Sequence, residues 1–210
     1  MLKRDFRAGE LRLLGLALVI AVASLSSVSF FSDRLSRALA REAHQLLGGD
    51  LLLVADHPWA GAYRAEAQRL GLRVVGSVGF PSMTSVNGAS HLADIKAVEP
   101  GYPLRGSLRI APALNQPDAE TRETPARGTV WLDERLASAL AAKVGDAVRL
   151  GNGVFAVSAV LTLEPDRGVN FFNIAPRLMM HADDLPATQL IQVGSRASSR
   201  LHLAGEATAV

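Results

Sequence analysis

The chain has 210 residues, of which 49% are hydrophobic and 20% are charged, and 22 basic against 20 acidic residues leave a net charge of +2. It contains no cysteine, which excludes a disulfide framework and a thiolate metal site. Basic residues form no long cluster, so we expect no nucleic acid partner. The length suits a membrane segment with one domain of ordinary size, or with two small lobes.

Residues 13–31, LLGLALVIAVASLSSVSFF, carry no charged side chain. At about 1.5 Å rise per residue, a helix of this length crosses the hydrocarbon core of a bilayer. Basic residues dominate the preceding segment: Lys3, Arg4, Arg7 and Arg12, against Asp5 and Glu10. Because cytoplasmic flanks are enriched in Lys and Arg, we expect residues 1–12 in the cytoplasm and residues 32–210 across the membrane.

Two alternatives to a permanent anchor remain open. Ala21-Val22-Ala23 resembles the A-x-A site of a cleavable signal peptide, which would place the rest of the chain on the same side. The apolar run continues to Phe31, whereas a signal core is normally followed by polar mature sequence, and this favours the anchor. The core helix of a soluble domain is the other alternative, although such helices are usually shorter and striped.

Residues 32–49 predict an amphipathic helix that ends at Gly48-Gly49. Its apolar residues recur at helical spacing: Leu35, Ala38, Leu39, Ala43, Leu46 and Leu47. We expect this helix to continue the membrane span as a stalk, and the pattern equally allows a helix packed on its own domain. Residues 50–210 would then form the core domain.

The first part of that domain alternates strand and helix signals. A short apolar run at 51–55 predicts a strand, and Pro58 opens a helix through Leu70. A strand at 73–80 follows, and residues 83–98 predict a hairpin around Asn87-Gly88. This order is typical of a small α+β sheet.

Residues 111–128 are rich in proline, charge and small side chains, and predict an exposed loop. Asp133 then suits the N-cap of a helix that Gly145 ends, with one stripe formed by Leu136, Leu140 and Val144. Two strands, 147–150 and 154–161, are predicted to pair through Gly151-Asn152-Gly153.

Motifs for nucleotide binding, serine hydrolysis or zinc proteolysis are absent from the sequence. The histidines are scattered at spacings that fit no local metal motif, and we expect surface or structural roles for them: His44, His57, His91, His181 and His202. The acidic pairs Asp133/Glu134, Glu164/Asp166 and Asp183/Asp184 lie at a helix start or in turns, where carboxylates serve backbone amides. We therefore predict no catalytic, cofactor-binding or metal-binding residues and no cofactor.

Phe171 and Phe172, between Asn170 and Asn173, allow two interpretations. They could form an exposed apolar tip for a partner or a lipid, or they could belong to the core.

Several stretches together resemble one family. They are RDFRAGELRLLGLALVIAVA at the first span, FFSDRLSRAL and LLGGDLLL after it, KAVEPGYPLRG at 96–106, and VWLDERLASALAAKVGDAVRLG, EPDRGVNFF and APRLMM later. In this order they resemble permease subunits of bacterial ABC transporters of the MacB and FtsX type, and most closely the YbbP-like permeases. The resemblance covers essentially the whole chain.

The resemblance implies a first transmembrane helix in the bacterial inner membrane and a periplasmic α+β domain. It also implies later transmembrane helices that contact a separate cytoplasmic ATPase, but no second run of 18 apolar residues follows Phe31. We therefore expect the chain to represent the N-terminal part of such a permease. Similar systems imply a non-catalytic subunit that relays ATP-driven motion, with hydrophobic or lipid-like substrates and a periplasmic esterase or lipoprotein as a further partner.

Two other functions stay open. A secreted or membrane-tethered periplasmic hydrolase or ligand-binding protein would require His91 or His181 to converge with a carboxylate in a concave pocket. An adhesion or scaffold domain would share the anchor and lack the ATPase partner.

Overall fold

The computed structural model describes residues 10–167, 175–192 and 194–205, without the side chains of 10–12 and 36–46. It divides into two compact units, residues 1–43 and residues 44–210. The helix α2 runs from Glu10 to Leu46. Gly48, at φ +63°, lies just beyond it, which agrees with the predicted end of the helix.

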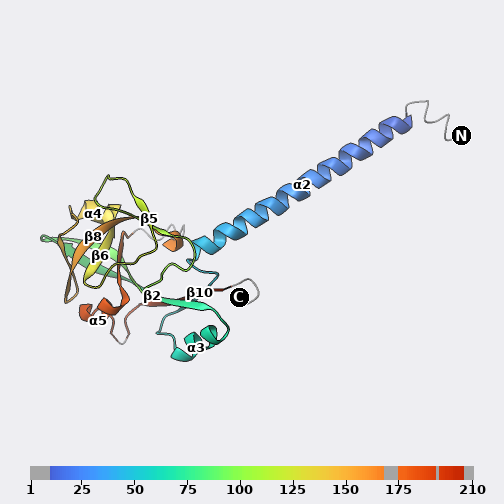
Figure 1. The fold of residues 1–210 in the computed structure, drawn as a ribbon. Coiled ribbons are helices and arrows are strands. Elements are labelled where there is room, and N and C mark those ends of the chain that lie inside the picture. The colour runs from blue at the N-terminus through green and yellow to red at the C-terminus, as the bar shows by residue number, and fades with distance from the viewer. Residues whose placement is uncertain (1–9, 168–174, 193, 206–210) are drawn as a thin grey trace. The chain divides into compact units, whose positions relative to one another are not determined.

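The second unit is built mainly from strands, with short helices between them (Figure 1). In chain order the elements are β1 (Leu51–Ala55), α3 (Gly61–Arg69), β2 (Arg73–Val86), β3 (Ala89–Val98), β4 (Leu108–Ala111), β5 (Ala119–Thr121), β6 (Thr129–Asp133), α4 (Glu134–Ala139), β7 (Ala147–Leu150), β8 (Gly153–Leu163), the 3-10 turn η1 (Pro165–Arg167), β9 (Arg177–His181), the 3-10 turn η2 (Ala182–Asp184), α5 (Leu185–Thr188) and β10 (Ser198–Ala204). The predicted α+β class is confirmed, and of the two arrangements left open, residues 44–210 form one compact unit.

The strands form one sheet in the order β1–β10–β2–β3–β9–β6–β8–β4–β5. β7 pairs with both β2 and β8, so the strands β2, β3, β9, β6, β8 and β7 close into a ring. Only the pairs β3–β9 and β6–β8 are parallel among the pairings described. Closure removes the exposed edges of these six strands.

The ring encloses the largest apolar cluster of the domain. Alternate residues of each strand point inward, because side chains in a strand alternate between the two faces. Ile95, Leu132, Leu150 and Leu178 are among those with no exposed surface, and Leu136 of α4 packs into the same cluster. The inner core is therefore shared by every strand of the ring.

The outer face of the ring is covered locally by the segment that follows β3. Tyr102 and Leu108 from this segment pack on Trp131, Met179 and neighbouring side chains in a second apolar cluster. A third, smaller cluster lies under α3, where Ala67 packs against strands β2 and β10. Together these layers bury both faces of the sheet around β2 and β3.

β10 lies between β1 and β2, so the end of the domain returns to its beginning. Leu51 pairs with Leu203, and the amide of Asp50 donates to the carbonyl of Leu203 over 2.8 Å. The Asp50 carboxylate accepts hydrogen bonds from Arg105 and from the Gly205 amide, while Arg105 also donates to the Gly205 carbonyl. The two chain segments are therefore held together where they enter and leave the domain.

Several predicted elements match the structure. β1 has the predicted bounds, and Asn87 and Gly88 adopt φ of +50° and +88°, as a two-residue hairpin turn between β2 and β3 requires. The hairpin β7–β8 turns at Gly151-Asn152, and Asp133 accepts the N-cap hydrogen bond from the Leu136 amide at 2.7 Å.

Other bounds were predicted wrongly. α4 ends at Ala139 instead of reaching Gly145, since Ala141 takes a left-handed φ of +51°, and Val144 is exposed. α3 begins at Gly61 rather than at Pro58, and the predicted loop 111–128 contains the short strand β5.

β2 continues through Pro81 to Val86, although the prediction ended it at Phe80. Pro81 lies beyond the part of β2 that pairs with β10 and before the part that pairs with β7. Its missing amide hydrogen therefore deprives no neighbouring strand of a hydrogen bond.

Candidate functional site

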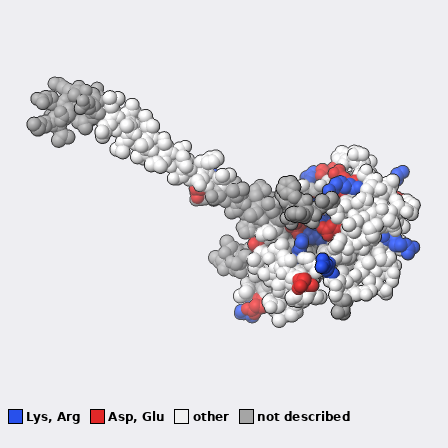
Figure 2. Space-filling model, turned by 180° about the vertical axis from the view of Figure 1, so that it is seen from behind, with Lys and Arg blue, Asp and Glu red and all other residues white. Residues whose placement is uncertain are grey.

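The apolar surface of α2 is the first functional feature. Leu13–Leu35 is a 23-residue segment with mean hydropathy 2.3, and none of its most apolar window is buried inside the structure. Figure 2 shows very few charged atoms on its described length. A helix that exposes Leu18, Ile20 and Val22 to this extent requires apolar surroundings, and its length fits the bilayer core.

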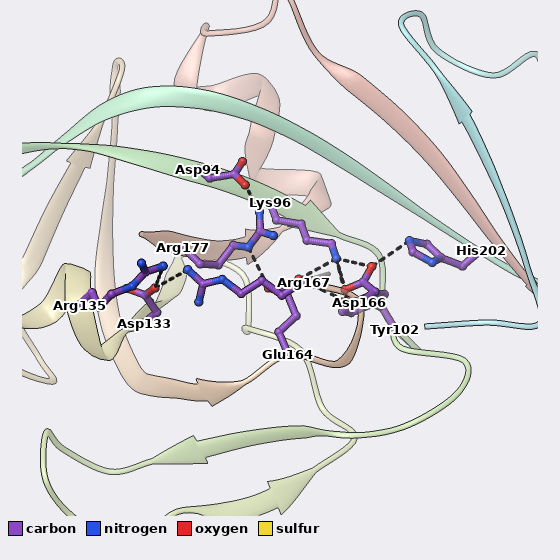
Figure 3. Close-up of polar contacts among 10 residues, drawn as sticks. All are labelled: Asp94, Lys96, Tyr102, Asp133, Arg135, Glu164, Asp166, Arg167, Arg177 and His202. Atoms are coloured by element: carbon purple, nitrogen blue, oxygen red, sulfur yellow. Dashed lines mark hydrogen bonds and ion pairs between the residues drawn. The ribbon is translucent and has the colours of Figure 1, made fainter. Parts of the chain in front are cut away.

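The second feature is a buried charge cluster on the outer face of the ring, which we call the Lys96 cluster: Lys96, Tyr102, Glu164, Asp166 and Arg177 (Figure 3). Lys96 Nζ donates to Tyr102 Oη, Glu164 Oε1 and both Asp166 carboxylate oxygens, each at 2.7 Å. The side chains of Lys96, Glu164 and Asp166 are 2%, 0% and 3% exposed. An ammonium has three donors, so Lys96 is fully satisfied.

Arg177 completes the cluster from the first position of β9. Its Nε donates to Glu164 Oε2 at 2.8 Å and its Nη1 donates to Asp94 Oδ2 at 2.7 Å. Asp94 and Arg177 are paired across β3 and β9, and Lys96 is two residues further along β3 on the same face. The strand register therefore places the two cations side by side between three carboxylates.

His202 of β10 borders the cluster. Its Nδ1 lies 3.0 Å from the carbonyl oxygen of Leu47, which can only accept, so Nδ1 carries the hydrogen. Its Nε2 then accepts from Ser77 Oγ at 2.9 Å and lies 3.9 Å from Asp166 Oδ2. A buried histidine is thus satisfied as a neutral ring.

Burial and charge shift the pKa values in this region in opposite directions. Burial raises the pKa of Asp166, but the nearby Lys96 ammonium outweighs it and holds the pKa at about 2. Burial, together with Glu164 and Asp166, raises the pKa of Tyr102 well above its usual value. Burial also lowers the pKa of His202, which favours the neutral ring. At neutral pH the Asp166 carboxylate is therefore ionised, and the Tyr102 phenol and the His202 imidazole are neutral.

Such a cluster is suited to holding elements together rather than to catalysis. Its donors and acceptors are already paired with one another, and the side chains of Lys96 and Glu164 are only 2% and 0% exposed. Within residues 10–167, 175–192 and 194–205, no group of three histidine or acidic side chains is placed to hold a metal ion. The cluster links β3, the segment after it, the turn after β8, and β9.

A cleft of about 940 Å³ opens beside the cluster. Asp94, Lys96 and Arg177 form part of its wall, and residues of β1, β2, β10 and the segment 194–197 form the rest. One of these residues is Arg200 of β10, which lies opposite Ser77 of β2.

The structure does not bring the candidate histidines together. His91 pairs with Thr84 and His181 with Val98, at opposite ends of β3, which separates them by roughly 23 Å at the usual rise of a strand. His91 contacts its neighbouring carbonyl, and His181 accepts from the Asp183 amide. Neither lines the cleft.

The remaining histidines are placed separately. His57 is exposed beside Asp56, His202 belongs to the buried network, and the side chain of His44 lies outside the described residues. Phe171 and Phe172, the candidate apolar tip, also lie outside them.

The acidic pairs differ from one another. Asp133 caps α4, as predicted, and Asp184 accepts from the Gly128 amide at 2.7 Å. The prediction for Glu164 and Asp166 was wrong, because their carboxylates bind the buried cations instead of turn amides.

Sequence reasoning thus missed the Lys96 cluster, although a signal for it was present. Lys96 stands between Ile95 and Ala97-Val98 near the end of β3, and a charge among such residues is almost never buried without a partner. Its partners come from KAVEPGYPLRG, EPDRGVNFF and APRLMM, three of the stretches that carry the family resemblance. The structure shows that these separated stretches meet at one place.

The anchor-like helix followed by this domain agrees with what the family comparison shows. Residues 13–207 match the MacB-like periplasmic core domain, and the chain belongs to this family. It is similar to YbbP, an uncharacterized ABC transporter permease of Escherichia coli strain K12, with 34% identity over 202 residues. The match covers 96% of this chain and 24% of that protein, so the chain spans about a quarter of its relative. The predicted resemblance is confirmed.

Solved structures of similar proteins include the periplasmic region of MacB from Actinobacillus actinomycetemcomitans, at 15% identity and a TM-score of 0.45, covering 78% of both chains. Another is the extracellular domain of the noncanonic ABC-type transporter YknZ from Gram-positive bacteria, at 12% identity and a TM-score of 0.45. That match covers 72% of this chain and 83% of the other.

Proposed function

We propose that this chain is the first transmembrane helix and the periplasmic core domain of an ABC transporter permease subunit in the bacterial inner membrane. In this proposal residues 1–12 are cytoplasmic, residues 13–31 cross the membrane, residues 32–49 form a stalk, and residues 50–210 form the periplasmic core. The single observation that carries it is the helix α2, 37 residues long, whose apolar segment opens the region that matches the MacB-like periplasmic core domain.

The mechanism we propose is mechanical. A separate cytoplasmic ATPase would hydrolyse ATP, and its motion would be relayed through the membrane part of the permease to the periplasmic domain. A continuous helix suits this role, because each backbone hydrogen bond joins one turn to the next and makes the helix resist bending. The subunit itself would be non-catalytic.

The work done by this motion would be export or extraction of hydrophobic or lipid-like molecules. Further partners would be membrane lipid and a periplasmic esterase or lipoprotein. A hydrolase is disfavoured because neither His91 nor His181 lines the cleft, and because Glu164 and Asp166 are paired with buried cations.

The topology can be tested directly because the chain has no cysteine. Single cysteines would be placed at Lys3, near the N-terminus, and at Ser90, in the exposed hairpin between β2 and β3. In cells with a permeabilised outer membrane, a membrane-impermeant maleimide should label S90C and leave K3C unlabelled until the inner membrane is opened. The opposite pattern, or release of the protein by carbonate, would refute the proposed anchor and orientation.

A test of the mechanical relay requires a longer permease. In this chimera, residues 1–210 replace the matching segment of the Escherichia coli relative. An ABC ATPase should copurify with this chimera, and trapping the ATPase with ATP and vanadate should change the rate of trypsin cleavage at the exposed residues Arg122 and Arg127. S32P, which interrupts α2, should keep the ATPase bound and abolish this nucleotide dependence. An unchanged dependence in S32P would refute transmission through the helix.

A further inference from the structure

The side chain of Arg200 lies in a region where most of the buried charges are paired. Its Nε atom is buried and has no hydrogen-bond partner, and no other described side chain contains such an atom. Buried donors are almost always satisfied, so an unpaired one at the wall of a cleft indicates a missing acceptor. Arg200 lies in the wall of the 940 Å³ cleft.

The neighbouring charges do not supply that acceptor. Asp94 is bound by Arg177, and Glu164 and Asp166 are bound by Lys96. Asp56, at the cleft margin, contacts His57.

Arg196 is a second cation at the cleft, and within the described ranges neither it nor Arg200 has a carboxylate within ion-pair distance. Two guanidinium groups therefore remain available to a ligand. Guanidinium groups match carboxylates and phosphates, which accept two parallel hydrogen bonds from them.

Apolar surface adjoins these cations. Val54 of β1 is paired opposite Arg200, so both side chains lie on the same face of the sheet, and Val54 is 56% exposed. Pro81, Ala175 and Ala197 line the same cleft. At Gly79 of β2 an added Cβ would make only an ordinary van der Waals contact, since its nearest atom, the Ile95 carbonyl oxygen, would lie 3.8 Å away. The cleft thus combines cationic groups with a shallow apolar floor.

We propose that this cleft binds the anionic head group of an amphiphile, a phosphate or a carboxylate, with Arg200 as its direct partner. The adjoining part of the ligand's apolar chain contacts Val54 and Pro81. The choice of an amphiphile over a free anion rests on the proposed handling of lipid-like molecules, whereas anion binding at Arg200 does not. The site gives the permease domain a means of recognising a charged lipid-like molecule outside the bilayer.

Binding is measured by isothermal titration calorimetry on the full 210-residue chain in a neutral maltoside detergent. The probes are hexyl phosphate, inorganic phosphate and hexanol, which separate the anionic and apolar parts of the ligand. The variants are R200Q and R149Q; Arg149 is exposed on β7 and does not line the cleft, so R149Q removes the same charge elsewhere. Uptake of hexyl phosphate by the micelles is the same for all three proteins and is subtracted.

The proposal expects hexyl phosphate to bind the wild type and R149Q equally and to bind R200Q about tenfold more weakly or worse, since a charge-assisted hydrogen bond is lost. Inorganic phosphate should bind more weakly than hexyl phosphate at the same site. If it binds as tightly, the free anion is the ligand and the amphiphile part of the proposal is overturned. Equal binding to R200Q, or no binding of any anion, overturns the site itself.

A structural role for Arg200 makes a different prediction. If the guanidinium stabilises the fold, R200Q should lower the melting temperature. If Arg200 serves a ligand, R200Q should unfold at the same temperature or a higher one, because it removes an unsatisfied buried donor. R200K, measured beside it, should recover part of the affinity because it restores the charge without the planar fork. The binding data do not depend on ATPase copurification, so either proposal can fail without the other.

Discussion

Removing the Lys96 ammonium should destabilise the domain more than any loss of a surface charge. K96M keeps the apolar stem of the side chain and deletes the atom that donates to Tyr102, Glu164 and Asp166, each at 2.7 Å. Arg177 still neutralises Glu164, but Asp166, whose side chain is 3% exposed, would lose the ammonium that offsets its burial. Breaking a buried ion pair from one side costs about 3–5 kcal/mol, because the other charge is left without a partner.

For a domain of this size, a loss of that magnitude corresponds to a fall in melting temperature of roughly 6–20 °C. The assay is denaturant unfolding at pH 7 in neutral detergent, followed by the fluorescence of Trp131, which is 4% exposed and packs against Tyr102 and Met179 in the second apolar cluster. The matched control is K143M, which removes an exposed lysine and should change the free energy of unfolding by less than about 0.5 kcal/mol.

The double variant K96M/D166N distinguishes a stranded charge from lost packing. If the cost of K96M arises from the unpaired Asp166 carboxylate, D166N should recover more than half of it, although D166N alone is destabilising. A loss below about 1 kcal/mol in K96M, or a double variant that is no more stable than K96M, would refute this account of the cluster.

Three further predictions concern single positions. Burial lowers the pKa of His202 below 6.5, so on acidification the unfolded chain binds a proton more readily than the folded domain does. The free energy of unfolding should therefore fall as pH drops below about 6.5. In H202N, the plot of this free energy against pH should be flatter between about pH 7 and 5. D133A removes the N-cap of α4 and should cost about 1–2 kcal/mol in urea unfolding. G76A should cost about 1–3 kcal/mol in the same assay, because the new Cβ would lie 2.7 Å from Glu99 Oε1 and would displace a carboxylate that accepts hydrogen bonds from Arg64 and from the amide of residue 76.

For each of these three predictions, one experimental outcome would contradict the reasoning. Identical pH curves for H202N and the wild type would exclude His202 as the titrating group. D133N retains an acceptor and should lose less than D133A, and equal losses would mean that the cap is not the cause. Gly79 is the control for Gly76, because its nearest neighbour lies 3.8 Å from an added Cβ, and equal effects of G76A and G79A would contradict the steric argument.

Local signals in the sequence were sufficient for the elements they define. The apolar run 13–31 predicted a helix, Asn87-Gly88 predicted the hairpin, and Asp133 predicted the start of α4. In each case residues close together in the chain decide the outcome, through helical spacing, a left-handed turn or a cap. The predicted end of α4 was wrong because Gly145 was taken as the residue that stops the helix, whereas the chain turns at Ala141.

Ring closure and the Lys96 cluster could not be predicted from local patterns. The ring depends on β7 pairing with β2, between residues more than 60 positions apart. The cluster depends on the register of β3 with β9, which aligns Asp94 with Arg177. A lysine flanked by Ile95 and Ala97 indicated that a partner must exist if the side chain is buried, but only the three-dimensional arrangement identifies that partner as the turn after β8.

The meeting of Asp50 and Gly205 has a consequence for how the domain fits into a longer polypeptide. A domain whose two connections are adjacent can be inserted between flanking segments without forcing them apart. When the two connections are pulled away from each other, the load would open β1 from β10 one hydrogen bond at a time, starting at Leu51 and Leu203. Arg105 donates hydrogen bonds to both Asp50 and Gly205 at the end where this opening begins. These bonds must therefore break before the two strands can separate.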